Sequence, residues 1–227
     1  MPVECRIHPS TEMPDDQTLT RLRALATSLV SDVFGRWAGA PGILPISGLT
    51  AGATMAGPAF TVRTRPGDNL VVHKALDLAR PGEILVIDAG GATDRAILGG
   101  LMGSYATMRG LAGLVIDGAV RDRSEMAQDA PPVFARALSH LGPYKNGPGD
   151  LRAPVSLGGV AVNDGDLIVG DENGIAVIPR DRCDEIITAA EAKRAAEEAE
   201  HAAIKAGTWD RRWIDQALTI VDAVPAR

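Results

Sequence analysis

Two short segments of the sequence carry residue types suited to binding a small anion and a metal ion. The first is the run Gly99-Gly100-Leu101-Met102-Gly103, and the second begins eighteen residues later with Arg121-Asp122 and includes Glu125. Glycine lets a ligand approach the backbone closely, and the amides that begin a helix attract carboxylate or phosphate groups. Arg121 offers a rigid fork for a carboxylate or oxo group, whereas Asp122 is a hard oxygen ligand of the kind Mg²⁺ prefers. The combination predicts chemistry on a small oxoacid.

Each segment also has a purely structural interpretation. Clustered glycines can seat a helix tightly on a sheet, and Arg121, Asp122 and Glu125 could form a surface ion pair with a helix cap. The glycine spacing matches neither the dinucleotide fingerprint nor a P-loop. His73 falls among apolar residues of an expected helix, so a buried side chain is favoured over a role in a site. The lysines, Lys145 among them, lie in polar or helical-surface contexts, and none stands out as a Schiff-base former.

Composition narrows the classes of function. The chain has 227 residues, 45% of them hydrophobic, and a net charge of −6, which argues against a nucleic-acid partner. No apolar run approaches the roughly 20 residues that a membrane span needs, so no membrane partner is expected. Cys5 and Cys183 are far apart and match no zinc or redox spacing, so two unpaired thiols are expected. The N-terminus lacks a basic-then-apolar signal segment, which favours a cytoplasmic protein.

Alternating strands and helices are expected to position the two segments. Strands are predicted by the apolar runs at 59–64, 83–88, 114–116 and 132–137. The run at 114–116 is followed by an expected turn at Asp117-Gly118. Helices are expected over 19–33, capped by Thr18 or Asp16, over 69–79, capped by Asn69 or Asp68, and within 95–109. Strand, helix and strand in this order predict a right-handed crossover between parallel strands.

The last third of the chain is expected to contain short strands followed by one long helix. Short strands are expected at 160–162, 167–170 and 175–178, with a hairpin at Asn173-Gly174. A long helix should run from Asp181 to about residue 206 and end at Gly207. We therefore expect an N-terminal arm over 1–17, one α/β domain over 18–180, and a helix and tail over 181–227 that pack on the domain or on a neighbouring subunit.

The sequence resembles the RraA-like family, the proteins similar to regulator of ribonuclease activity A. The resemblance rests on Gly100, twenty intervening residues, Arg121-Asp122 and, after two more residues, Glu125, within the similar stretches 82–88, 113–122 and 170–175. This family includes the class II 4-hydroxy-4-methyl-2-oxoglutarate/4-carboxy-4-hydroxy-2-oxoadipate aldolases. The resemblance implies a single-domain β/β/α sandwich of the swivelling-domain type with a long C-terminal helix, assembled as a homotrimer or hexamer.

The resemblance also implies roles for individual residues. In the aldolases, the residue matching Asp122 binds Mg²⁺, Mn²⁺ or another divalent metal directly, with waters completing the coordination. The residue matching Arg121 binds the oxo group of pyruvate, and amides in the segment of Gly100, Leu101, Met102 and Gly103 bind its carboxylate. Other aldolases carry Asp at position 100. Here Glu125 takes the place of that acid and would reach the metal through water.

These observations predict a divalent-metal-dependent aldolase that cleaves 4-hydroxy-2-oxoacids to pyruvate and an oxoacid. Oxaloacetate decarboxylation passes through the same enolate and is expected as a second activity. The opposing hypothesis is a non-catalytic, ribonuclease-regulator-type module that binds a protein partner. A quinone methyltransferase is disfavoured because no glycine-rich S-adenosylmethionine loop is present. One of the acids Glu191, Glu197 and Glu198 could also reach a neighbouring subunit's site.

Overall fold

A long strand, β3 (Met55–Thr64), organises the central sheet. In the computed structural model, which describes residues 2–36 and 39–221, three further strands follow β3 in parallel: β4 (Ile84–Asp88), β6 (Gly113–Val120) and β7 (Val133–Leu138). The edges are formed by β1 (Cys5–Ile7), which pairs with β8 (Gly149–Leu151), and by β2 (Leu44–Ser47). A short strand, β5 (Ala96–Leu98), pairs with β6. The parallel pairing of β4 with β6 confirms that the crossover joins parallel strands, as predicted.

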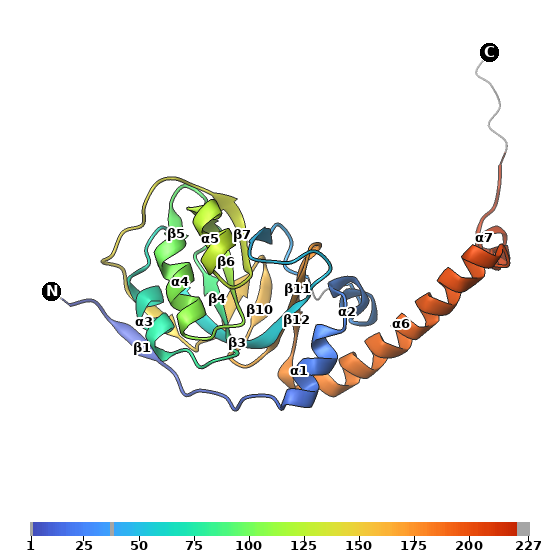
Figure 1. The fold of residues 1–227 in the computed structure, drawn as a ribbon, viewed down its shortest axis with the longest axis horizontal. Helices are drawn as coiled ribbons and strands as arrows, with labels where there is room; N and C mark the ends of the chain where they lie inside the picture. The colour runs from blue at the N-terminus through green and yellow to red at the C-terminus, as the bar shows by residue number, and fades with distance from the viewer. Residues whose placement is uncertain (1, 37–38, 222–227) are drawn as a thin grey trace, which may run out of the picture.

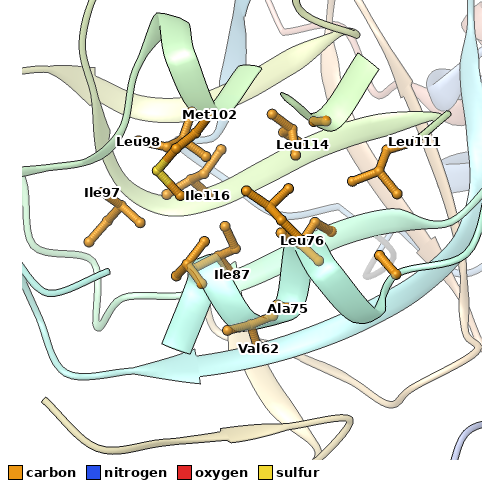
Figure 2. Close-up of a cluster of buried hydrophobic side chains, with 14 of the residues drawn as sticks. Val62, Ala75, Leu76, Ile87, Ile97, Leu98, Met102, Leu111, Leu114 and Ile116 are labelled. Carbon is orange, nitrogen blue, oxygen red and sulfur yellow. The ribbon is translucent and has the colours of Figure 1, made fainter. Parts of the chain in front are cut away.

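Three helices cover one face of this sheet: α3 (Leu70–Leu78), α4 (Gly100–Met108) and α5 (Arg123–Asp129) (Figure 1). Helix α3 buries Val71, Val72, Ala75 and Leu76, a spacing that gives one apolar stripe. Asn69, one of the two predicted caps, is the N-cap residue of α3, but its side chain makes no capping hydrogen bond; the Asp68 carboxylate accepts the Leu70 amide at 2.9 Å instead. Figure 2 shows the labelled side chains from these helices and strands meeting in one apolar cluster.

A second layer of strands covers the other face. The hairpin of β11 (Leu167–Asp171) and β12 (Gly174–Ile178) pairs with the first half of β3, and β9 (Val155–Leu157) pairs with β10 (Val160–Val162). A second apolar cluster, with Phe134 fully buried, joins these strands to the central sheet. The molecule is therefore the expected β/β/α sandwich, and the hairpin at Asn173-Gly174 is confirmed.

The terminal helices pack on the outer side of the β11–β12 hairpin. These are α1 (Asp16–Arg23), α2 (Thr27–Val33) and the first part of α6 (Cys183–Ala206), which follows a 3₁₀ turn, η1 (Arg180–Arg182). The buried residues of α6 all lie between Cys183 and Ala190, and the rest of the helix projects away from the body toward α7 (Arg212–Ala217) (Figure 1). Gly207 ends α6 with a φ of +69°, as predicted. Cys5 and Cys183 are both free thiols, also as predicted.

The prediction of a single helix over 19–33 is wrong, because the chain forms two helices there, α1 and α2. The carboxylate of Asp171 accepts hydrogen bonds from the amide of Thr27 at 2.9 Å and from its hydroxyl at 2.7 Å. This contact between distant parts of the chain fixes the start of α2 and interrupts the helical pattern. The N-cap of α1 is Asp15, which accepts the Thr18 amide at 2.7 Å, rather than Thr18 or Asp16.

Two other local expectations need correction. The prediction of a turn at Asp117-Gly118 is wrong, because both residues lie inside β6. The Asp117 carboxylate there pairs with Arg136 and accepts a hydrogen bond from the Gly158 amide at 2.7 Å. The N-terminal arm is not wholly irregular, because Cys5–Ile7 pairs with β8 and α1 begins at Asp16. Across the described residues, no helix has the length and apolar character that a bilayer crossing requires.

Candidate active site

The start of α4 presents unpaired backbone amides. Gly99, in extended conformation, is the N-cap, and the amide of Gly103 makes a hydrogen bond to the Gly99 carbonyl at 3.0 Å. Gly99 has no side chain with which to cap the helix, and the Asp122 carboxylate accepts a hydrogen bond from the Gly100 amide at 3.3 Å. The amides of Leu101 and Met102 precede the first helical hydrogen bond, so they are oriented to bind an anion where the helix dipole favours one.

The end of β6 brings Arg121 and Asp122 to the same place. The Arg121 amide donates to the Leu98 carbonyl at 3.0 Å, which joins the end of β6 to the end of β5. Asp122 follows with φ 58° and ψ 41°, a left-handed conformation, and serves as the N-cap of α5. A non-glycine residue in this region is uncommon, and such residues concentrate at functional sites.

The Asp122 carboxylate faces both segments. Its Oδ2 lies 3.3 Å from the Gly100 amide nitrogen and 3.4 Å from Nε of Arg121. The side chains of Arg121 and Asp122 are 42% and 38% exposed, so both remain accessible to a ligand. The guanidinium and the carboxylate thus lie side by side at the N-terminus of α4.

Gly99 and Gly100 are required by the close approach of two carboxylates. A Cβ placed on Gly99 would collide with the Asp122 carboxylate, and one on Gly100 would collide with Glu125, at 2.9 Å from its Cβ. Asp122 and Glu125 therefore lie against consecutive residues of the same backbone segment. The absence of a side chain at position 100 is what makes room for the Glu125 carboxylate.

Gly103, expected in the substrate-binding segment, has a different role. Its amide is used within α4, and a Cβ on it would lie 2.8 Å from Cβ of Ala130. Gly103 therefore lets α4 pack closely against the end of α5. The backbone available to a ligand is limited to the first turn of the helix.

Two hollows meet at Arg121 and Asp122, which line both of them. The smaller hollow has a volume of about 140 Å³ and is also lined by the start of α4. For comparison, a cavity of about 150 Å³ in another protein holds a ligand of six carbon atoms. The larger, of about 330 Å³, is lined in addition by Arg123, Leu138, Ser139 and His140. The first hollow therefore has room for a small organic molecule, and the second shares Arg121 and Asp122 with it.

Three polar side chains that line the smaller hollow were not predicted as site residues: Asn69, His73 and Lys145. His73 is exposed, so the favoured interpretation of a buried histidine is wrong. It lies off the stripe formed by Val71, Val72, Ala75 and Leu76, a signal that the sequence did contain. Lys145 gives no such signal, because its loop is placed by a distant contact, the Asn69 amide donating to the Tyr144 carbonyl at 3.1 Å.

The acidic residues fit a magnesium-type ion better than a fully enclosed metal site. Among the described residues, no three His, Cys, Asp or Glu side chains gather as a metal-binding group. Asp122 and Glu125 each approach the first residues of α4, and of the two only Asp122 lines the hollows described above. Mg²⁺ keeps several waters and is usually held by one or two carboxylates together with the substrate, whereas zinc sites take three or four protein ligands.

The comparisons with known proteins identify the family. A family model described as RraA-like, Aldolase/RraA, matches residues 27–177. The chain belongs to the RraA-like family. It is 38% identical over 187 residues to a protein of Halalkalibacterium halodurans named "Putative 4-hydroxy-4-methyl-2-oxoglutarate aldolase", across 82% of this chain and 88% of that protein.

Solved structures of RraA-like proteins share the fold. The RNA-processing inhibitor RraA from Thermus thermophilis superposes with a TM-score of 0.61 at 32% identity, covering 68% of this chain and 92% of that one. RraAS2 of Streptomyces coelicolor, titled an unusual member of the RNase ES inhibitor RraA family, gives 0.74 at 26% identity, covering 83% and 98%. The relatives of this RraA-like chain thus include proteins named as an aldolase and proteins named as inhibitors of RNA processing.

Proposed function

We propose that this RraA-like protein is a divalent-metal-dependent aldolase. It would cleave 4-hydroxy-2-oxoacids, such as 4-hydroxy-4-methyl-2-oxoglutarate or 4-carboxy-4-hydroxy-2-oxoadipate, to pyruvate and a second oxoacid. The observation that carries the proposal is the convergence of the Asp122 carboxylate, the Arg121 guanidinium and the free amides of α4. The aldolase name of the H. halodurans relative supports the same conclusion.

The substrate is held at the part that becomes pyruvate. The amides of Leu101 and Met102 bind its C1 carboxylate at the positive end of the helix dipole. Arg121, beside Asp122, binds the 2-oxo oxygen and is placed where negative charge develops during the reaction. Asp122 would hold Mg²⁺ or Mn²⁺, with Glu125 reaching it through water, and the ion when bound supplies Lewis-acid polarisation of the ketone.

Cleavage then requires one proton transfer and one broken carbon–carbon bond. Glu125 orients a water that accepts the proton of the C4 hydroxyl, and C4 becomes the carbonyl carbon of the leaving oxoacid. The C3–C4 electron pair passes to C3, giving the pyruvate enolate, whose oxygen Arg121 stabilises. Proton return to C3 completes pyruvate. Oxaloacetate loses CO₂ to give the same enolate, so decarboxylation is a second activity of the same site.

A coupled pyruvate assay tests the proposal. Pyruvate release from a panel of 4-hydroxy-2-oxoacids and from oxaloacetate is followed with lactate dehydrogenase, before and after EDTA and after Mg²⁺ is returned. We expect EDTA and Asp122→Asn each to remove nearly all turnover. Asp129→Asn, the same change at an exposed position of α5, should leave it intact. Turnover that survives EDTA or Asp122→Asn would refute the metal role.

The second candidate is a protein-binding module without catalysis, and the names of the two solved RraA relatives favour it. Such a module has no need of Glu125 beside Gly100. It predicts no pyruvate from any oxoacid in the presence of Mg²⁺, together with inhibition of a ribonuclease on direct contact. The aldolase proposal predicts the opposite result in the first assay.

We further propose that the protein acts in the cytoplasm as a homotrimer or hexamer. The outer part of α6 and the segment after it expose Ile204 (47%), Trp209 (38%) and Trp213 (61%), apolar area that a neighbouring subunit would cover. Glu191 is held by Arg21 of its own chain at 2.8 Å, whereas Glu198 has a longer contact, 3.9 Å to Arg194, and is 72% exposed to a neighbouring subunit. Light scattering of the purified protein measures the subunit number.

A further inference from the structure

Lys145 enters the smaller hollow with its ammonium group already held by two acceptors. Its Nζ lies 2.9 Å from Oδ1 of Asn69 and 3.3 Å from Nε2 of His73. All three residues line the hollow that contains Asp122 and the start of α4. An ammonium group has three N–H donors and no acceptor, so this arrangement leaves one donor for a ligand.

The orientation of Asn69 is fixed from the opposite side. Its Nδ2 donates to the Ile97 carbonyl at 2.8 Å and to the sulfur of Met102 at 3.3 Å. Because the amide nitrogen is used in these contacts, Oδ1 must face Lys145. Asn69 is only 2% exposed, so it has little freedom to turn. Asn69 therefore connects Lys145 to Met102, whose backbone amide lies in the first turn of α4, where we propose that the substrate carboxylate binds.

His73 is the second support, and only its neutral form can serve. Lys145 must donate, so Nε2 must accept, and the ring proton then resides on Nδ1. Partial desolvation of the ring at the wall of the hollow is the first cause, and the charge of Lys145 the second, that lower the pKa of His73, while Asp77 on the same helix acts in the other direction. The net direction favours the neutral ring that the contact requires.

We propose that His73 is a positioning residue: with Asn69, it directs the third N–H of Lys145 onto the carboxylate of the bound 2-oxoacid, beside the amides of Leu101 and Met102. The inference deepens the proposed function and depends on it for the identity of the substrate. A compact ammonium held in one direction adds a point charge to the helix dipole without blocking the face used by Arg121 and Asp122.

Binding of oxalate tests this role separately from turnover. Oxalate is a planar dicarboxylate with the shape of the pyruvate enolate, and its dissociation constant is measured by calorimetry in the presence of Mg²⁺. Loss of a hydrogen bond to a charged group weakens binding by about tenfold or more. We expect about this loss for His73→Leu, at least as much for Lys145→Met, and recovery to within about twofold of the original protein for His73→Gln, whose amide oxygen can accept.

Lys74→Met removes a neighbouring exposed lysine of α3 that does not line the hollow, and it should bind oxalate unchanged. Thermal unfolding checks that each variant is folded. The inference is overturned if His73→Leu or Lys145→Met binds as tightly as the unchanged protein, or if His73→Gln binds as weakly as His73→Leu. Absence of oxalate binding by the unchanged protein would overturn it as well. If the unchanged protein binds oxalate in this pattern but releases no pyruvate from any oxoacid, the aldolase proposal fails and the role of His73 stands.

Discussion

Gly100→Ala tests directly how the Glu125 carboxylate is placed. The new Cβ would lie 2.9 Å from Cβ of Glu125 and 3.1 Å from its Cδ, well inside the roughly 3.5–4.0 Å of a normal carbon contact. Glu125 is exposed, so its side chain can turn into solvent and relieve the contact at Cδ, whereas the contact between the two Cβ atoms requires a small backbone shift between α4 and α5. Alanine also favours a helix by about 1 kcal/mol relative to glycine. We therefore expect a folded protein whose melting temperature stays within roughly 4 °C of the original.

The effect on catalysis should be much larger than the effect on stability. Removal of a general acid–base group lowers the rate by roughly 10²–10⁴, which corresponds to about 2.7–5.5 kcal/mol. Glu125→Ala removes the carboxylate, and Gly100→Ala displaces it, so the two losses should be similar. Because both changes act on one group, the double variant should be no slower than Glu125→Ala alone.

The measurement is kcat/KM for pyruvate release by the original protein, both single variants and the double variant. Met108→Ala, at the exposed end of the same helix, is the control and should leave the rate unchanged. The reasoning is refuted if Gly100→Ala keeps full activity. It is also refuted if the loss in the double variant equals the sum of the single losses in free energy, because the two positions would then act independently.

Three further outcomes are expected. Gly99→Ala should lower kcat/KM more than Gly100→Ala in the same assay, because its Cβ would collide with the Asp122 carboxylate itself. Arg152→Met should lower the free energy of unfolding, measured in urea, by about 3–5 kcal/mol. The reason is that the Arg152 side chain is only 6% exposed and pairs with Glu83 at 3.1 Å and with Asp164 at 2.9 Å. The control Arg212→Ala removes an exposed ion pair and should leave the free energy of unfolding unchanged. Burial raises the pKa of Cys183 from 9.0 to about 11, so iodoacetamide at pH 8 should modify this thiol only after unfolding. The contribution of the neutral thiol to the free energy of unfolding is complete below pH 9 and is lost as the pH rises through about 11, because the thiol of the unfolded chain ionises first. Urea midpoints of the original protein and of Cys183→Ala, compared across this pH range, measure that loss.

Elements whose character is local could be predicted from the sequence. Residues 84–88 form a strand buried over most of its length, so the apolar run was nearly continuous, and the Asn173-Gly174 turn needed only its own two residues. The break between α1 and α2 had no local signal, because Asp171, far along the chain, fixes it. Asp117 was mistaken for a turn residue because its partner, Arg136, lies on another strand.

The same distinction applies to the candidate site. Gly100, Arg121 and Asp122 are brought together by the pairing of β5 with β6, which the spacing of the family pattern anticipates. His73 was assigned to the core although its position on α3 lies off the buried stripe. Lys145 reaches the hollow through a loop whose docking depends on contacts with the start of α3, and no periodic pattern describes such a loop.

The left-handed backbone of Asp122 affects how this site can change in evolution. Main-chain geometry fixes the position at which this side chain leaves the backbone, and that position does not depend on the remote side chains that line the two hollows. In the proposed aldolase, those remote linings could therefore change during evolution, and with them the substrates accepted, while Asp122 keeps its position. Only residues that tolerate a positive φ, chiefly glycine and asparagine, could replace Asp122 without bending the chain, and neither carries a negative charge. Diversification of specificity is thus structurally easier here than loss of the acid followed by its recovery elsewhere.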